Sequence, residues 1–330
     1  MKIIQQIDFD GEKADAILAV MRSKMPGEPS WSVVRKLLRG RKVAIGGVIC
    51  LDEGRRITPG EQISIYDQPL PPPPTDQDVK ICHVDEDIIV VEKPSGMLTL
   101  RRHTDLNWTW ARKNLHPTLD ECVPRLIGQH AAEKKNNHRN YLKLPKLFPV
   151  HRIDRDSSGL LVFARNEDAQ TKVIHQFAQH DAVRKYFALV PGKLKDQTIR
   201  SQFIRDRGDG LRGSTEDLTI GEHAVTHIKT IQQIAGFSEL QCTLETGRTN
   251  QIRIHLAELG HPICGDIKYR GKFGKPKIRD RSGIRRLALH AAELCFVHPT
   301  TDKKMKFETN WPKQMRDFLK KLQTPRSVQT

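Results

Sequence analysis

A proline-rich run near the beginning of the chain divides the sequence into two parts of different character. Residues 68–78 read QPLPPPPTDQD. Proline cannot donate a backbone hydrogen bond to a β-ladder, and consecutive prolines favour an extended polyproline segment. The run therefore predicts a linker at 69–79 that separates a small module, residues 1–68, from a larger body, residues 80–322. The last residues, 323–330, are rich in Ser, Gln and Thr, and we expect a disordered tail there.

The small module contains a helical pattern with a basic rim. Val33, Val34, Leu37 and Leu38 fall on one face of a helix. The cations on the opposite side and at the end of this helix are Arg35, Lys36, Arg39, Arg41 and Lys42. Short strand patterns follow, and a helix with a basic rim suits a phosphate backbone, although a solvated charged helix gives the same pattern.

The segment from the helix to residue 67 resembles an S4 RNA-binding domain. In that family an apolar and basic helix is followed by an Asn-Gly turn and then by a strand that begins at Gly-Asp. Here Gly46 and Gly47 occupy the turn, and Gly60 and Glu61 precede the strand. The resemblance implies a small α+β domain that binds RNA through the five cations.

The charge of the whole chain favours the same kind of partner. The 330 residues include 55 Lys and Arg against 39 Asp and Glu, a net charge of +16. A polyanion is the natural ligand of such a protein. No apolar run approaches the roughly 18 residues that a membrane helix needs. The N-terminus carries acids where a signal peptide would have an apolar core, so we expect a cytoplasmic protein without a membrane partner.

Motifs for metals and cofactors are missing from the sequence. The six cysteines are widely spaced, so no CxxC pair is available for zinc or for dithiol chemistry. There is also no Walker A loop, no GxGxxG after a strand and no GxSxG elbow. We therefore expect neither a metal nor a cofactor.

The larger body contains an acidic residue in a setting suited to chemistry. Residues 151–164 read HRIDRDSSGLLVFA, in which Asp154 lies between two arginines and shortly before an apolar, strand-like run. The pattern predicts a carboxylate on a loop at the mouth of a strand. Taken alone, an Asp in a surface turn with solvated arginines would explain the same residues, because exposed ion pairs contribute little.

Three further segments change that interpretation. They are IIVVEKPSGMLTL at 88–100, VRKYFALVPG at 183–192, and ETGRTNQIRIHLAELGHPICGDIKYR at 245–270. With the Asp154 segment, and in this order, they resemble the RluA family of pseudouridine synthases, whose strings have the form HRLDxxTSGLLL, KxYxAxVxG and GRTHQIRxHLxxxGHPIxGDxxY. Asn250 stands where the family usually has His and Ser157 where Thr is common. We expect these departures to tune the site and not to abolish activity.

The strand and helix patterns after residue 160 predict an α+β body. The expected strands are at 160–164, 186–190, 223–232, 238–245 and 293–297, and the expected helices are at 167–179 and 249–259. A mixed, mostly antiparallel central sheet with helices packed outside accommodates this order, and the resemblance implies the same architecture. Residues 101–150 lack clear periodicity, and we expect a surface insertion near the mouth of the site.

The resemblance also implies roles for individual residues. Asp154 would act at the ribose of the target uridine, Arg253 would form a salt bridge with it, and Tyr186 would stack on the base and assist removal of the proton from C5. Arg152 would fill the space that the everted uridine leaves in the RNA. The remaining residues expected to line the substrate groove are His151, Lys93, Lys185, Arg248 and Gln251. Asp154 could attack C1′ as a nucleophile or remove the C2′ proton to give a glycal, and the residues fit both routes.

Several functions are compatible with these features. We expect an RNA pseudouridine synthase that works as a monomer without a cofactor, with large-subunit ribosomal RNA as the preferred substrate, because an S4-like module accompanies several family members with such targets. The alternatives are a tRNA-directed relative, a base-excising N-glycosidase and a non-catalytic RNA-binding factor of ribosome assembly.

Overall fold

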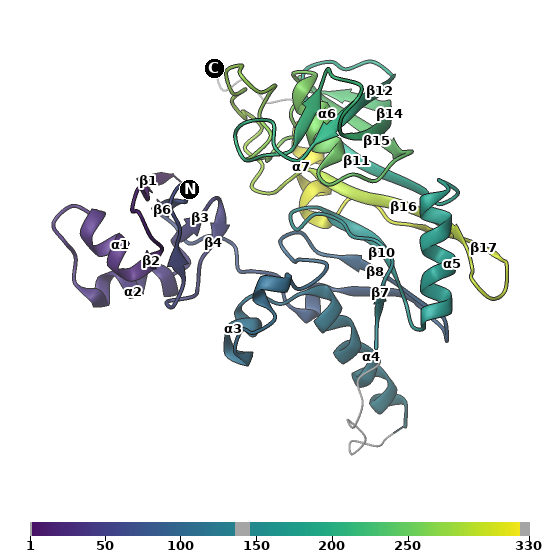
Figure 1. Cartoon of the computed structure of the whole chain (residues 1–330), viewed down its shortest axis with the longest axis horizontal. Helices are drawn as coiled ribbons and strands as arrows, with labels where there is room; N and C mark the ends of the chain where they lie inside the picture. Colours follow the sequence, from purple (N-terminus) through teal and green to yellow (C-terminus); the bar gives the residue numbers. More distant parts are fainter. Residues whose placement is uncertain (1, 136–145, 324–330) are drawn as a thin grey trace. The chain divides into compact units, whose positions relative to one another are not determined.

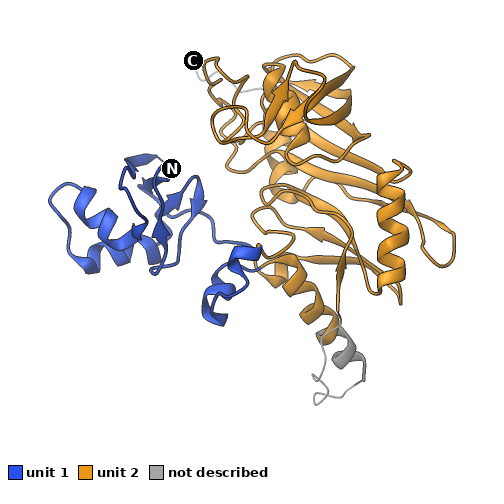
Figure 2. Ribbon diagram, in the orientation of Figure 1, with its two compact units in different colours: residues 1–74, 103–117 blue, residues 75–102, 118–330 orange. Residues whose placement is uncertain are grey.

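The chain forms two compact units. The structure is a computed structural model that describes residues 2–135 and 146–323. One unit comprises Met1–Pro74 and His103–Pro117, and the other comprises Thr75–Arg102 and Thr118–Thr330 (Figure 2). The sequence division placed 103–117 in the larger body, whereas the structure groups this segment with the first unit. The expected disordered tail lies, apart from residue 323, outside the described residues, as does part of the expected insertion.

The first unit contains a small sheet and three helices. The sheet has the strand order β1-β6-β3-β4, and a separate pair is formed by β2 and β5. The strands are β1 (Ile3–Asp8), β2 (Asp15–Ala16), β3 (Val43–Ile45), β4 (Val48–Ile49), β5 (Arg56–Ile57) and β6 (Gln62–Tyr66). The helices are α1 (Ile17–Lys24), α2 (Trp31–Arg39) and α3 (Trp110–Leu115), the last preceded by the short 3₁₀ helix η2 (His103–Asp105).

Helix α2 is the basic helix that the sequence predicts. The side chain of Ser30 caps its N-terminus by accepting a hydrogen bond from the backbone N–H of Val33. Val34 and Leu38 are buried in the core of the unit, whereas the Val33 side chain is exposed. The apolar face of α2 is therefore narrower than the sequence pattern indicates.

The second unit is built on an eleven-stranded sheet. Nine strands follow the order β13-β12-β14-β15-β11-β16-β10-β8-β7, with β17 paired to β16 and β9 paired to β10 (Figure 1). The strands are β7 (Lys80–Val84), β8 (Ile88–Lys93), β9 (Phe148–Pro149), β10 (Ser158–Ala164), β11 (Val183–Pro191), β12 (Gln197–Ile204), β13 (Gly213–Thr215), β14 (Glu222–Ile234), β15 (Phe237–Leu244), β16 (Leu289–Val297) and β17 (Lys304–Glu308). Strands β10 and β16 are parallel, and the other pairings are antiparallel. The predicted α+β class with a mixed, mostly antiparallel sheet is confirmed.

Helices cover both faces of this sheet. They are α4 (Leu119–Lys135), α5 (Glu167–Ala178), α6 (Gln251–Glu258) and α7 (Lys313–Gln323), with the 3₁₀ helix η1 (Asp76–Asp78) near the start of the unit. Along β10, Leu161 and Phe163 belong to the apolar cluster that includes α4, α6 and α7, whereas Leu160 and Val162 belong to the cluster that includes α5. Because successive side chains of a strand point to opposite faces, α5 lies on the face opposite to α4 and α7 (Figure 1).

Candidate active site

A tightly held loop carries Asp154 to the start of β10. The backbone N–H of Ser157 donates to the carbonyl oxygen of Asp154 (3.2 Å), which closes a turn immediately before the strand. Gly159 has a φ of 114°, and a Cβ at this position would collide with the backbone of Ala291 on β16. Only glycine therefore allows β10 and β16 to approach here, and the close parallel pair fixes the end of the Asp154 loop.

Arg253 reaches the same place from α6. Its Nη1 lies 3.6 Å from Oδ2 of Asp154, and both side chains are largely buried. Arg253 is itself held by Asp266, whose carboxylate accepts hydrogen bonds from Nε (2.7 Å) and Nη2 (3.0 Å). The structure thus brings together the two residues, 99 positions apart in the chain, that the sequence analysis pairs.

Burial and nearby positive charge act on Asp154 in opposite directions. Burial raises the pKa of Asp154 above its ordinary value, and the positive charges of Arg253 and Arg152 oppose this rise. A carboxylate with a raised pKa is a stronger base and a better nucleophile once it is ionised.

Asp154 opens into a cavity of about 600 Å³ in the second unit. Tyr186 and Arg253 also line this cavity, and among the other predicted residues so do Arg152, His151, Arg248 and Gln251. Asp154 is the one carboxylate among the described lining residues. Arg152 is exposed, and within the described chain its side chain forms no hydrogen bond or ion pair, so it is available to a ligand.

Tyr186 and His151 are neutral groups in this cavity. Burial raises the pKa of Tyr186 to about 12, so its hydroxyl stays protonated near neutral pH. Burial and the positive charge of Arg184 lower the pKa of His151 to about 3. His151 Nε2 accepts a hydrogen bond from the backbone N–H of Val162 (3.2 Å), which fits an uncharged imidazole. His151 therefore fixes the loop before β10, and we do not assign it a charged contact with RNA.

Two predicted groove residues do not line the cavity. The Lys93 side chain is fully buried, and its Nζ donates to the backbone carbonyls of Pro94 (2.9 Å), Met97 (2.7 Å) and Arg155 (3.0 Å). It ties the start of the KPSG turn to the Asp154 loop. Lys185 forms an ion pair with Glu293 (2.9 Å) instead of facing the cavity. Because side chains alternate along β11, its neighbours Arg184 and Tyr186 face the cavity in its place.

Gln251 lines the cavity but its amide is committed to the protein. The Oε1 atom accepts from Thr246 Oγ1 (2.8 Å) and from the backbone N–H of Arg248 (2.9 Å). Its Nε2 donates to the carbonyl of Val225 (2.9 Å) and to Thr226 Oγ1 (3.0 Å). Gln251 therefore positions the start of α6, whereas the Arg248 side chain remains more than one third exposed.

Comparisons with known proteins bear directly on this arrangement. A family model described as RNA pseudouridylate synthase matches residues 87–258, which include Asp154, Tyr186 and Arg253. The chain belongs to the RNA pseudouridine synthases. Members of this family isomerise uridine to pseudouridine in RNA, so the chain is an enzyme of that class.

Relatives extend the match to nearly the whole synthase. The chain is 30% identical over 330 residues to the uncharacterized RNA pseudouridine synthase YlyB of Bacillus subtilis, and the match covers 97% of this chain and 99% of the relative. It is 33% identical over 265 residues to the ribosomal large subunit pseudouridine synthase D of Zymomonas mobilis, covering 78% of each chain. The solved human RNA pseudouridylate synthase domain containing 4 has the same fold, with a TM-score of 0.55 and 20% identity over 74% of this chain and 92% of that structure.

Three further residues lie at this site of the synthase and were not among the predicted site residues. Asp266 anchors Arg253 through a hydrogen bond, and Cζ of Arg253 lies over the Tyr269 ring, 5.0 Å from the ring centre. Arg184 lines the cavity beside Tyr186. Signals for all three were present. The D and Y that end the GRTHQIRxHLxxxGHPIxGDxxY pattern fall on Asp266 and Tyr269, and the first position of the KxYxAxVxG pattern falls on Arg184 and not on Lys185.

Asn250, which departs from the usual motif of the synthases, links two of these parts. Its Oδ1 accepts from Arg253 Nη1 (2.8 Å), and its Nδ2 donates to the hydroxyl of Tyr269 (3.2 Å). The residue adopts a left-handed conformation (φ 60°), which Asn tolerates better than most side chains. Asn250 therefore completes the shell around Arg253.

The predicted cations of the first unit have different surroundings. Arg35 and Arg39 both form ion pairs with Glu53 (3.3 and 2.7 Å), and Lys42 Nζ donates to the carbonyl of Asp67 (2.7 Å). Lys36 is exposed, and Arg41 is half-buried at the end of the helix. The basic rim of α2 is thus partly neutralised by Glu53.

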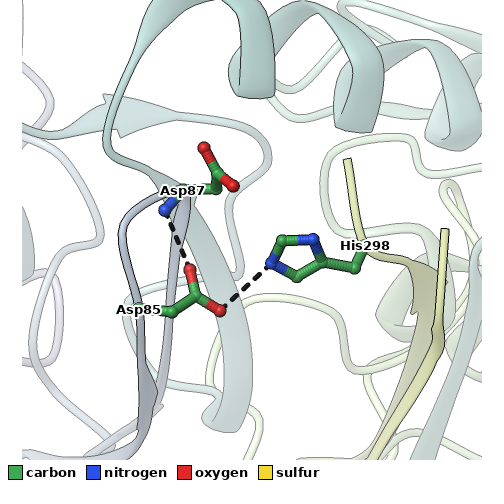
Figure 3. Close-up of side chains that lie close together, drawn as sticks. All are labelled: Asp85, Asp87 and His298. Atoms are coloured by element: carbon green, nitrogen blue, oxygen red, sulfur yellow. Dashed lines mark hydrogen bonds and ion pairs between the residues drawn. The ribbon is translucent and has the colours of Figure 1, made fainter. Parts of the chain in front are cut away.

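A group of possible metal ligands lies apart from the cavity-lining residues of the synthase. Asp85, Asp87 and His298 lie within 4.8 Å of one another (Figure 3). Oδ1 of Asp85 accepts the backbone N–H groups of Asp87 and Ile88 (2.8 Å each), and Oδ2 contacts His298 Nε2 (3.1 Å). His298 Nδ1 accepts backbone N–H groups as well. Asp85 thus closes the turn between β7 and β8, His298 closes a turn after β16, and Oδ1 of Asp87 accepts from Asn166 (2.9 Å), so each residue already has a structural role.

None of the described helices has the length and apolar character needed to cross a bilayer.

Proposed function

We propose that the chain isomerises uridine in large-subunit ribosomal RNA, with Asp154 acting at the ribose, Arg253 as its salt-bridge partner and Tyr186 against the base. The observation that carries this proposal is the meeting of Asp154 and Arg253 at 3.6 Å in a cavity that Tyr186 also lines. Relatives named ribosomal large subunit pseudouridine synthase D support the choice of RNA.

The chemistry of isomerisation matches the residues in the cavity. The N1–C1′ bond must break, the base must turn, C5 must bond to C1′, and the proton must leave C5 while N1 gains one. A hydrolytic glycosidase uses two carboxylates, one of which commonly activates water or forms the covalent intermediate while the other is an acid. Asp154 is the single carboxylate among the described lining residues, which favours isomerisation over base excision. Asp154 can serve either as a nucleophile at C1′ or as a base at C2′.

The aromatic ring of Tyr186 suits a base that must pivot without escaping. Stacking of a base on an aromatic side chain contributes about 1–3 kcal/mol. A uridine must also be everted from its stack at a cost of a few kcal/mol. The exposed guanidinium of Arg152 lies at the cavity and can occupy the space that the uridine vacates, as the family resemblance implies.

A basic loop of the second unit offers an additional RNA contact. Between Asp266 and β16 the chain carries seven exposed cations, of which Lys272 is paired with Glu216 (3.4 Å). The other six form no ion pair within the described residues and are Lys268, Lys275, Lys277, Arg279, Arg281 and Arg285. The loop is anchored near the site, because the Gly265 N–H, beside Asp266, donates to Asp280 (2.5 Å). We assign this loop and the basic rim of α2 to the RNA backbone.

The test is a map of pseudouridine in a strain that lacks the gene. Total RNA from this strain is incubated with the purified protein, treated with carbodiimide and read by reverse-transcription stops. One or a few new stops in large-subunit ribosomal RNA are expected, and Asp154→Asn protein should produce none. New stops only in transfer RNA would redirect the substrate, release of free uracil would indicate hydrolysis, and no change in any RNA would refute the proposed activity.

A further inference from the structure

Arg184 is a buried cation that the reaction described above does not use. It lies on β11 two residues before Tyr186, and both side chains line the cavity. Only 8% of Arg184 is exposed. Lys185, between them, points to the other side of the strand and pairs with Glu293.

The positive charge of Arg184 is only weakly compensated by hydrogen bonds and charges of the described protein. Its Nη2 donates to the carbonyl of Glu245 (3.2 Å), and its Cζ lies 5.2 Å from the centre of the Phe177 ring. The Nε atom is buried without a hydrogen-bond partner. Within the described residues no carboxylate forms an ion pair with Arg184, in contrast to Arg253, which has Asp266 and Asp154.

The backbone segment beside Arg184 leaves room for its guanidinium. A Cβ at Gly247 would collide with Nη1 of Arg184, so the absence of a side chain there accommodates the guanidinium. Gly247 itself lines the cavity. A buried charge without a counter-ion is costly, and such a group is explained when an anion arrives in the complex.

We propose that Arg184 binds a backbone phosphate of the RNA next to the target uridine, and this assignment rests on the proposed function. A phosphodiester supplies the missing negative charge, and its oxygens match the planar fork of donors on a guanidinium. A uracil carbonyl could accept a hydrogen bond from Arg184, but a neutral oxygen would leave the buried charge uncompensated. Because Arg184 and Tyr186 share one face of β11, the phosphate would be held beside the stacked base.

The experiment combines protein variants with charge-neutral linkages in the RNA. The probe is a synthetic hairpin centred on the uridine mapped in the experiment above, with the native phosphate or a methylphosphonate on the 5′ or 3′ side of that uridine. The proteins are wild type, Arg184→Gln, Arg184→Lys and Lys185→Gln, the last being a matched removal of a cation from the opposite face. Affinity and single-turnover rate are measured for every combination, and thermal melting checks the folding of each variant.

One methylphosphonate should weaken binding or turnover by the wild type about 10- to 100-fold, as expected for loss of a hydrogen-bonded charge. With native RNA, binding or turnover by Arg184→Gln should be weaker than that of the wild type by a similar factor. The methylphosphonate that weakens the wild type should cause almost no further loss in Arg184→Gln. Arg184→Lys should lose less, and Lys185→Gln should behave as wild type. Full sensitivity of Arg184→Gln to both methylphosphonates would overturn the assignment. Failure to map any uridine refutes the proposed function, whereas absent coupling at a mapped uridine refutes this subsite alone.

Discussion

Asp266 fixes the position of Arg253, and its removal should be costly. The Asp266 side chain is fully buried, forms two hydrogen bonds to the Arg253 guanidinium, and also accepts the backbone N–H groups of Lys268 (2.8 Å) and Tyr269 (3.0 Å). Breaking a buried ion pair by removing one partner costs about 3–5 kcal/mol, and Asp154, 3.6 Å from Arg253, leaves part of the charge compensated, so the lower end of this range applies. We expect Asp266→Ala to lower the stability of the second unit by this amount. Asp266→Asn, which keeps one oxygen acceptor, should cost less.

The same change should slow the reaction. Without Asp266, the nearest carboxylate to Arg253 is Asp154, and the guanidinium can move from its 3.6 Å separation toward a direct hydrogen bond. Such a bond would occupy the oxygen that we propose to act at the ribose and would lower the pKa of Asp154. A misplacement of about 1 Å at a reacting group can cost about 100-fold in rate. We therefore expect Asp266→Asn to reduce the single-turnover rate by one to two orders of magnitude while RNA affinity changes little.

The stability assay can be confined to the second unit. Trp311 is buried and is the one tryptophan of this unit, since the other three, at positions 31, 108 and 110, belong to the first. In a background with those three changed to Phe, Trp311 fluorescence during urea unfolding reports on the unit that contains Asp266. Asp168→Asn is the control, because Asp168 forms an exposed pair with Lys172 and should cost less than about 1 kcal/mol. If Asp266→Ala unfolds at the wild-type urea concentration and keeps the wild-type rate, the proposed anchoring is wrong.

Three further outcomes follow from the site. Burial raises the pKa of Asp154 and the carboxylate is the proposed reactive form, so the single-turnover rate with saturating RNA should fall as pH drops through a value above the ordinary 3.8. Arg152→Gln removes a positive charge that opposes this rise, so the fall in rate should move to higher pH. An unchanged rate–pH profile would argue against an electrostatic effect of Arg152 on Asp154. Tyr186→Phe keeps the ring, so affinity by fluorescence anisotropy should change less than about threefold while turnover falls at least tenfold; a fully active variant would show that the hydroxyl is dispensable. Four exposed cations of the basic loop can be changed to Gln together: Lys275, Lys277, Arg279 and Arg281. This change should reduce the slope of log affinity against log salt concentration by up to about four. An unchanged slope would show that the loop does not contact the RNA.

The sequence predicted the central sheet well where period and turn signals are strong. The run from Leu160 to Ala164 is apolar throughout because β10 is buried on both faces, and the predicted helix at 167–179 begins where Asn166 caps α5. Helix α7 was missed, although its apolar residues, including Met315 and Leu319, lie at helical spacing near the end of the chain. The eight-residue strand β12 was missed because it has little apolar alternation, and β13 was missed because it is only three residues long.

The candidate site was predictable only in part. The motifs identify Asp154 and Arg253 and also contain Asp266, but the contact of Asp266 with Arg253 depends on a chain reversal after α6 that local sequence does not specify. The error at Lys185 has a simple cause, because a shift of one residue along a strand moves a side chain to the opposite face. The resemblance implied Lys93 at the groove, whereas three backbone carbonyls hold its Nζ in the interior.

The separation between Asp154 and Arg253 is itself suited to the reaction. At 3.6 Å the two groups attract each other, yet the distance is too long for a strong hydrogen bond. Asp266 makes this longer distance possible, because it accepts two hydrogen bonds from the Arg253 guanidinium, at 2.7 and 3.0 Å, so that Arg253 does not need a direct hydrogen bond to Asp154. The charge of Arg253 then offsets part of the cost of burying Asp154, while a carboxylate oxygen stays free for its proposed contact with the ribose. A tighter pair would stabilise the carboxylate at the expense of its reactivity.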